Sequence, residues 1–218
     1  MPQSITTVRR NGRPSTLSRE LILQAGLDVA RSAPNTPVSI SAIARALGVT
    51  PMALYTYFGN RDELMQALSA RLLAGLFVDM PPNATPIEQV FAWAHAVRNY
   101  CLEHPQIHTM LMWEGGHSST AWLNFSQPLF DAAQSLGFTG ARQGLVMLWL
   151  WNSVMGAVRF EAHLLQTGKT AVDDEEALAP EVRNGVRLVR MVADSEEGQG
   201  LYFDFQLERI ADTLIALS

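Results

Sequence analysis

Residues 39–64 constrain the fold of this chain more than any other stretch, because they carry the start, turn and stop signals of two short helices. Ser39 can cap a first helix, since its hydroxyl accepts a hydrogen bond from an otherwise unpaired backbone N–H. Gly48 suits the left-handed conformation that ends a helix, and Thr50 with Pro51 suits the start of a second one. Between these signals, apolar residues recur at helical spacing: Ile40, Ile43, Ala44 and Leu47.

The second helix is predicted to have one buried and one exposed face. Leu54 and Phe58 stand four residues apart and are expected to pack on the first helix. Gly59 ends the helix, and Asn60 caps the next one. The outward positions include two tyrosines, which combine apolar area with a hydroxyl donor: Met52, Ala53, Tyr55, Thr56 and Tyr57. Two short helices joined by a glycine-containing turn are the helix-turn-helix pattern of DNA-binding proteins.

This stretch resembles the DNA-binding domain of the TetR family of bacterial transcriptional regulators, over residues 12–70. The matching residues form the turn, the recognition helix and the start of the helix after it: Gly48, Val49, Thr50, Leu54, Tyr55, Phe58, Asn60 and Arg61. The resemblance implies a three-helix DNA-binding domain followed by a larger helical domain for ligand binding and dimerisation. The remainder of the chain agrees with the family only in being helical and apolar.

The chain is therefore predicted to be all-α. Its predicted parts are a flexible basic arm, a helix-turn-helix DNA-binding domain, and a helical ligand-binding and dimerisation domain, at residues 1–16, 17–62 and 63–218. No strand pattern is present in the last of these. Caps, breakers and spacing predict helices that cover residues 18–33, 39–47, 50–58, 61–78, 86–103, 106–113, 119–136, 141–166, 180–193 and 203–217.

The charge distribution favours a nucleic-acid partner at one end of the molecule. The net charge is −5, but residues 1–75 hold eight arginines against four acidic residues. A basic head on an acidic body directs phosphate affinity to the head. Arg13 lies in an Arg-Gly-Arg-Pro cluster just before the first helix, and we expect this arm to reach phosphates or a minor groove.

The family resemblance also implies which residues contact double-stranded DNA. Base-edge contacts fall on four residues of the recognition helix: Pro51, Met52, Ala53 and Tyr57. Tyr55 and Arg61 fall where phosphates are gripped, and Ser39, Ser41 and Thr50 lie at helix starts near the DNA backbone. Met52 and Ala53 carry no hydrogen-bonding side chain, so any readout there is apolar, such as contact with a thymine methyl group.

The helix predicted at residues 141–166 is apolar nearly all round and must be covered on both sides. One cover is the core of its own subunit, and a second subunit is the simplest source of the other. Together with the last helix it matches the dimerisation helices of the family by pattern. The predicted homodimer interface consists of Met147, Trp151, Val154, Val158, Leu207, Ile210 and Leu214.

The family resemblance implies a small-molecule effector pocket in the body, and five tryptophans and nine methionines are ample for an adaptable apolar cavity there. The alternative, that these side chains are simply core, stays open for each of them. Burying the polar residues Asn152 and Arg159 requires partners, so they could orient a ligand, satisfy one another or cross the dimer interface, and we expect them to line the pocket. The full predicted lining is Trp93, Met110, Trp113, Trp122, Phe125, Leu129, Trp149, Asn152, Met155 and Arg159.

Other chemistry is not indicated. No catalytic constellation is present and no cofactor is implied. His104 and His108 stand four apart, but Pro105 places His104 at a helix cap and no second ligand pair shows metal-site spacing, so no metal is expected. The single cysteine, Cys101, rules out an intrachain disulfide. The basic N-terminus lacks the apolar core of a secretory signal, and no apolar run is long enough to span a membrane, so we expect a bacterial cytoplasmic protein.

These features together predict a transcription regulator, a repressor that a small, largely apolar ligand releases from a palindromic operator. Two alternatives stay open. One is a regulator of the same fold that a protein partner controls without a small molecule. The other is a small-molecule enzyme with an incidental helix-turn-helix, which the lack of catalytic residues disfavours.

Overall fold

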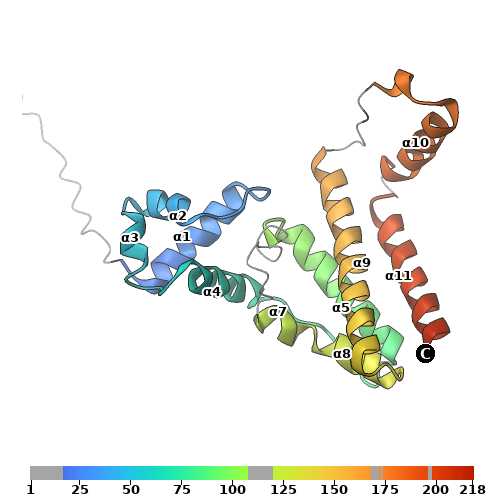
Figure 1. The fold of residues 1–218 in the computed structure, drawn as a ribbon, viewed down its shortest axis with the longest axis horizontal. Helices are drawn as coiled ribbons and strands as arrows, with labels where there is room; N and C mark the ends of the chain where they lie inside the picture. Colours follow the sequence, from blue (N-terminus) through green and yellow to red (C-terminus); the bar gives the residue numbers. More distant parts are fainter. Residues whose placement is uncertain (1–16, 108–119, 168–171, 173, 196–197) are drawn as a thin grey trace, which may run out of the picture.

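The structure, a computed structural model, describes residues 17–107, 120–167, 172, 174–195 and 198–218. These residues form helices and connecting turns with no strand, which confirms the all-α prediction (Figure 1). The N-terminal head contains α1 (Arg19–Ser32), α2 (Ile40–Leu47), α3 (Pro51–Leu54) and α4 (Arg61–Leu73). The body contains α5 (Pro86–Glu103), α7 (Thr120–Phe125), α8 (Gln127–Ser135), α9 (Gly140–Thr167), the 3-10 turn η1 (Glu175–Ala177), α10 (Pro180–Ala193) and α11 (Gly198–Leu217).

The head forms where its cap residues predict. Ser18, Ser39 and Asn60 each accept a hydrogen bond from the backbone N–H three residues on, at the starts of α1, α2 and α4. Gly48 ends α2 in the left-handed region, with φ at 67°. The buried contacts between the head helices come from Ile22, Leu27, Ile43, Leu54, Phe58, Leu64 and Leu68.

The helix predicted to run from Arg61 to Val78 ends at Leu73 instead. The backbone N–H of Leu76 bonds to the Leu73 carbonyl, which is a tight turn, and the chain continues without helix to α5. Residues 74–85 are called the connector below. Phe77, which lies within the range predicted as helix, is 76% exposed. The predicted length of this helix was wrong because apolar residues continue at helical spacing after Leu73, the last residue of the helix and one that the core still covers.

The body is a bundle of α5, α8, α9 and α11, in which α9 packs along α11 and α5 packs on α8 and α9 (Figure 1). The helix predicted over 119–136 is two helices, α7 and α8, which meet at Ser126. Its buried hydroxyl donates to the carbonyl oxygen of Trp122, and Pro128 stands in the first turn of α8. Helix α4 contacts both α1 and α7, so it links the head to the body.

One buried ion pair joins two body helices. Arg98 on α5 donates from Nε to Glu161 Oε2 at 2.6 Å and makes a second bond from Nη2 to Oε1. The Glu161 side chain is 5% exposed, and the Arg98 guanidinium lies 5.1 Å from the ring centroid of Phe203 on α11. A single arginine therefore connects α5, α9 and α11.

Candidate functional site

Residues 50–58, called the recognition segment below, lie on the surface of the head. Met52 is 73% exposed, and Ser41, Thr50, Pro51 and Tyr55 are also exposed. Leu54 and Phe58 are fully buried beneath them, as predicted. The α-helical part of the segment is only Pro51–Leu54, and backbone hydrogen bonds from Tyr55, Tyr57 and Phe58 continue it as turns. These outward residues form a projecting edge of the size that a major groove admits.

Tyr57 is not available for the predicted base-edge role. Its hydroxyl donates to the Leu17 carbonyl oxygen at 2.6 Å, and its own carbonyl accepts from Arg19 Nη1 at 2.8 Å. The side chain is half-buried and packs on the head core. Sequence spacing placed Tyr57 beside the outward residues, but the turn after Leu54 directs its phenol back toward α1.

Arg19 holds the end of the recognition segment in place. Besides the bond to Tyr57, its guanidinium lies 4.1 Å from the Phe58 ring centroid and 2.9 Å from Glu63 Oε1. Glu63 also accepts from the Gly59 N–H at 2.7 Å. That backbone bond, followed by the Arg19 bond, lowers the pKa of Glu63 below its ordinary value. The charges of this cluster therefore fix the turn between the recognition segment and α4.

The head's remaining arginines divide into two groups. Arg31 pairs with Asp28 and Arg71 with Glu20, so both are engaged within the head. Arg45 is exposed on the last turn of α2 and makes no ion pair with any residue that the structure describes. The DNA contacts predicted from the sequence did not include Arg45. The excess of arginine over acidic residues in the head is the feature of the sequence that could have drawn attention to it.

The other predicted DNA contacts fall as follows. Ser39 is exposed, and its hydroxyl is used as the α2 cap. Ala53 and Arg61 are half-buried, with Arg61 at the first position of α4. Arg13 lies outside the described residues.

Three aromatic rings of the predicted effector pocket meet in the body. Trp93 lies 5.7 Å from Trp122 and 5.9 Å from Phe125, and the last two rings are 5.8 Å apart between centroids. The indole N–H of Trp93 is buried and has no hydrogen-bond partner within the described part of the chain. Leu129 and Met155 are buried and Trp149 is half-buried, whereas Met110 and Trp113 lie outside the described residues.

Asn152 and Arg159 do not line that pocket. Both are exposed on the face of α9 that carries Leu145 and Leu148, and the Asn152 amide donates to the Leu148 carbonyl of its own helix at 2.7 Å. The prediction failed because it took all polar residues in an apolar helix to be buried. These two lie on a face that the protomer leaves open.

The residues predicted for the homodimer interface face the protomer's own core. Trp151 packs against Phe130 at 5.9 Å between ring centroids and donates to Ser126 at 3.3 Å. The other six are at most 3% exposed: Met147, Val154, Val158, Leu207, Ile210 and Leu214. These side chains are therefore not open to a second subunit. Periodicity reveals two apolar faces on a helix but not which one its own subunit covers.

Neither a metal-binding cluster nor a membrane-spanning helix occurs among the described residues. No three His, Cys, Asp or Glu side chains there gather closely enough to hold a metal ion. No described helix is both long and apolar enough to cross a membrane.

Comparison with known proteins agrees with this geometry. The model of bacterial regulatory proteins of the tetR family matches residues 22–68, which contain α2, α3 and the glycine turn. The HTH-type transcriptional repressor SCO4008 of Streptomyces coelicolor is 29% identical over 84 residues, or 38% of this chain. The match spans 42% of that repressor, less than half of its length.

Solved structures share the whole fold at low identity. A possible TetR family transcriptional regulator from Streptomyces coelicolor has a TM-score of 0.72 at 22% identity, covering 92% of this chain and all of that one. BioQ with its double-stranded DNA operator has a TM-score of 0.65 at 20% identity, covering 92% of this chain and 99% of that one. ActR of Streptomyces coelicolor, in complex with (S)-DNPA, has a TM-score of 0.65 at 18% identity, covering 94% of this chain and 100% of that one.

The family model covers the head where the recognition segment lies, and the structural likeness extends over the body. Residues 22–68 therefore match the DNA-binding domain of the tetR family of bacterial regulatory proteins, and the chain as a whole shares the fold of solved TetR-family structures.

Proposed function

We propose that the protein is a homodimeric repressor that holds a palindromic operator and releases it when a small, largely apolar ligand binds in the body. The observation that carries this proposal is the exposed recognition segment on a head rich in arginine, joined through α4 to an aromatic-rich body. The SCO4008 relative is named a repressor, which supports repression. The structures of BioQ with its DNA operator and of ActR with (S)-DNPA support operator binding and ligand binding.

The recognition segment reads DNA mainly through apolar contact. Met52 is its most exposed apolar side chain and is placed to meet base edges together with Pro51 and Ala53. Tyr55 and Arg45 supply hydrogen-bond donors for phosphates, and Tyr57 supports the segment from below. Apolar readout favours a thymine methyl group at the position under Met52.

The second subunit is expected on the open faces of α9 and α11. On α9 the exposed stripe includes Leu145, Leu148 and Gly156, and a Cβ atom added to Gly156 would meet no other atom within 4 Å. On α11 the exposed apolar side chains are Leu201, Phe205, Ile215 and Leu217. Exposed apolar rows on two adjacent helices mark a protein interface, and a two-fold dimer matches a palindromic operator.

The ligand is expected at the Trp93–Trp122–Phe125 cluster, where the unpaired Trp93 N–H calls for an acceptor. Helix α7 carries Trp122 and Phe125 and packs on α4. A ligand that moves α7 would therefore shift α4 and change the separation of the two recognition segments. It can do so only if it binds the two states of the protein unequally.

Selection of bound sequences from a random DNA pool tests the DNA-reading part. The wild type at near-physiological salt should recover a two-fold palindrome, with half-sites about one helical turn apart. Met52→Ala should relax the preference at one position of each half-site, while Gln24→Ala on α1 should leave the motif unchanged. Recovery of no motif, or of the same motif at equal strength with Met52→Ala, would contradict this reading of the head.

Light scattering tests dimer formation, and operator-release assays test the response to a ligand. Leu148→Glu should convert the dimer to a monomer, whereas Leu165→Glu near the far end of α9 serves as the control for surface charge. The recovered operator then supports a screen for apolar compounds that release it. A motif-binding dimer that no compound releases would favour control by a protein partner.

A further inference from the structure

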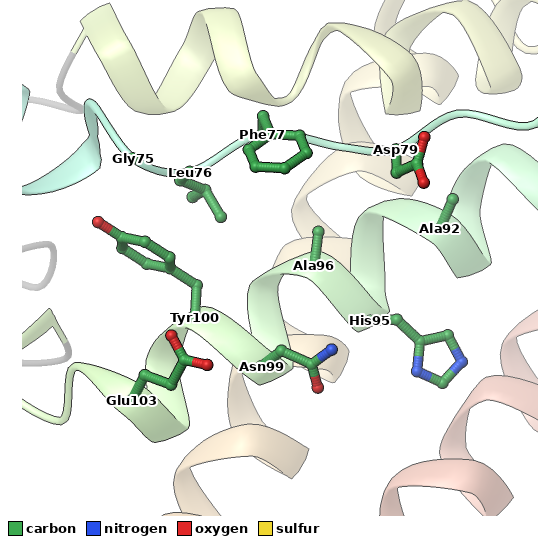
Figure 2. Close-up of a pocket in the computed structure, with 10 residues that line it drawn as sticks. All are labelled: Gly75, Leu76, Phe77, Asp79, Ala92, His95, Ala96, Asn99, Tyr100 and Glu103. Atoms are coloured by element: carbon green, nitrogen blue, oxygen red, sulfur yellow. The ribbon is translucent and has the colours of Figure 1, made fainter.

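A groove of about 500 Å³ lies between α5 and the connector. Its α5 residues recur three or four apart, so they share one face of that helix. The buried residues Val97 and Cys101 lie on nearly the opposite face. The lining consists of Gly75, Leu76, Phe77, Asp79, Ala92, His95, Ala96, Asn99, Tyr100 and Glu103 (Figure 2). A volume of this size is in the range of small-molecule sites.

The lining is acidic and aromatic. Its two carboxylates are Asp79 and Glu103, and neither forms an ion pair within the described part of the chain. Figure 2 shows Tyr100 rising from α5 toward the connector, with Leu76 and Phe77 on the facing side. Burial first, and then the Glu103 carboxylate, raise the pKa of Tyr100, and both residues line the groove.

Such a lining suits a positive charge attached to an apolar group. Aromatic faces and carboxylates both attract an ammonium ion, and the attraction to a ring grows as the cation is desolvated. Leu76, Ala92 and Ala96 offer apolar surface for the remainder of the molecule. An anion would meet two carboxylates and no arginine or lysine in this lining, so charge excludes that class.

The groove also touches the end of α4. The hydroxyl of Tyr100 donates to the carbonyl oxygen of Leu72 in the last turn of that helix. A Cβ atom added to Gly75 would lie 3.2 Å from the same hydroxyl oxygen, so the phenol fits closely under the connector. Helix α4 begins directly after the recognition segment, at Arg61. A molecule beside Tyr100 is therefore in contact with the side chain that fixes the body end of α4.

We propose that this groove is a second ligand site, which binds a small organic cation between the carboxylates and the Tyr100 and Phe77 rings. Its occupancy acts on α4 through the Tyr100–Leu72 hydrogen bond. The binding half of the proposal stands on the groove alone. The regulatory half rests on the proposed ligand-responsive function, because it uses the same helix to reach the head.

Calorimetric titration of the full chain with benzyltrimethylammonium chloride tests binding. We expect a saturable isotherm for this cation and none for benzyl alcohol or benzoate, which keep the ring without the positive charge. The variant carrying both Asp79→Asn and Glu103→Gln should weaken binding by about tenfold or more, since the attraction between the cation and both negative charges of the groove is lost. Glu181→Gln, an exposed carboxylate on α10, should leave the isotherm unchanged. Equal binding of benzyl alcohol, or an unchanged isotherm with the double variant, would overturn the site.

Amide hydrogen exchange tests the link to α4 without requiring an operator. Saturating benzyltrimethylammonium should change the exchange of amides in the last turn of α4 and at Gly75 and Leu76. Tyr100→Phe should bind the cation within about threefold of the wild type, because it keeps the ring face, but should lose most of that change. Unchanged α4 exchange in the wild type with the probe bound would overturn the regulatory half. Failure of the DNA selection would instead count against the proposed function and leave the calorimetric result standing.

Discussion

The hydroxyl of Tyr57 donates a hydrogen bond to the carbonyl oxygen of Leu17 at 2.6 Å, across 40 positions of sequence. This bond ties the end of the recognition segment to the residue that precedes the α1 cap. Since Arg19 also donates to the Tyr57 carbonyl, both polar groups of the residue are used inside the head. Tyr57 thus orients the recognition segment, and neighbouring Tyr55 is the tyrosine that faces outward.

Removing that hydroxyl should destabilise the head. Tyr57→Phe leaves the half-buried Leu17 carbonyl without its partner, and we expect a loss of about 1 kcal/mol in the free energy of unfolding. Tyr55→Phe is the matched control, and its effect on stability should stay within about 0.5 kcal/mol because the residue is exposed. Urea unfolding followed by circular dichroism measures both. Equal stability of the two variants would show that the Leu17 bond contributes nothing.

Gly48 should tolerate asparagine better than alanine. Its φ of 67° lies in the left-handed region, and an added Cβ would meet no atom within 4 Å, so any cost is conformational rather than steric. We expect Gly48→Ala to lose about 1–2 kcal/mol of stability, and Gly48→Asn to lose less because asparagine visits this region more readily. Thermal unfolding of both variants measures the difference. An alanine variant as stable as the wild type would mean that the turn relaxes out of this conformation.

Glu63 should make the stability of the head depend on acid pH. The Gly59 N–H and then Arg19 lower its pKa in the folded state relative to the ordinary 4.5. A depressed folded pKa contributes stability that is present above the unfolded pKa and is lost as the pH falls through the folded value. Glu63→Gln should therefore reduce stability at pH 7 but have little effect near pH 3. A difference from the wild type that is equal at both pH values would contradict this coupling.

The elements that could be predicted from the sequence are those that local signals determine. Ser39, Gly48 and Asn60 act within three residues of their own position, so the head followed from its caps and its glycine turn. The open face of α9 could not be predicted, because Leu148 and Val154 look alike in a helix that is apolar nearly all round. The groove beside Tyr100 depends on where α4 ends and on how the connector crosses α5, which are properties of tertiary packing.

Cys101 should be inert in the folded protein. The residue is 2% exposed, and burial raises the pKa of its thiol to about 12. Because the thiolate is the reactive form, a disulfide reagent at pH 8 should react with the native protein far more slowly than with the protein in denaturant. Cys101→Ser, which lacks any thiol, provides the baseline. Rapid stoichiometric labelling of the native state would show that α5 opens on the timescale of the assay.

The Arg98–Glu161 pair should show an asymmetric cost when either partner is removed. The Glu161 side chain is 5% exposed and that of Arg98 is 24% exposed. Arg98→Met leaves a buried carboxylate unpaired and should cost about 3 kcal/mol of stability. Glu161→Met leaves an arginine that reaches water, so its cost should be smaller. Urea unfolding of the two variants gives this comparison.

The double variant separates the pair from the packing around it. With both charges replaced by methionine, no unpaired charge remains, and the loss should be well below the sum of the single losses. Arg31→Met, which breaks an exposed pair with Asp28, should change stability by less than about 1 kcal/mol. Additive single losses would mean that the two side chains act separately, and that the link between α5, α9 and α11 is made by apolar packing, with Phe203 at its centre.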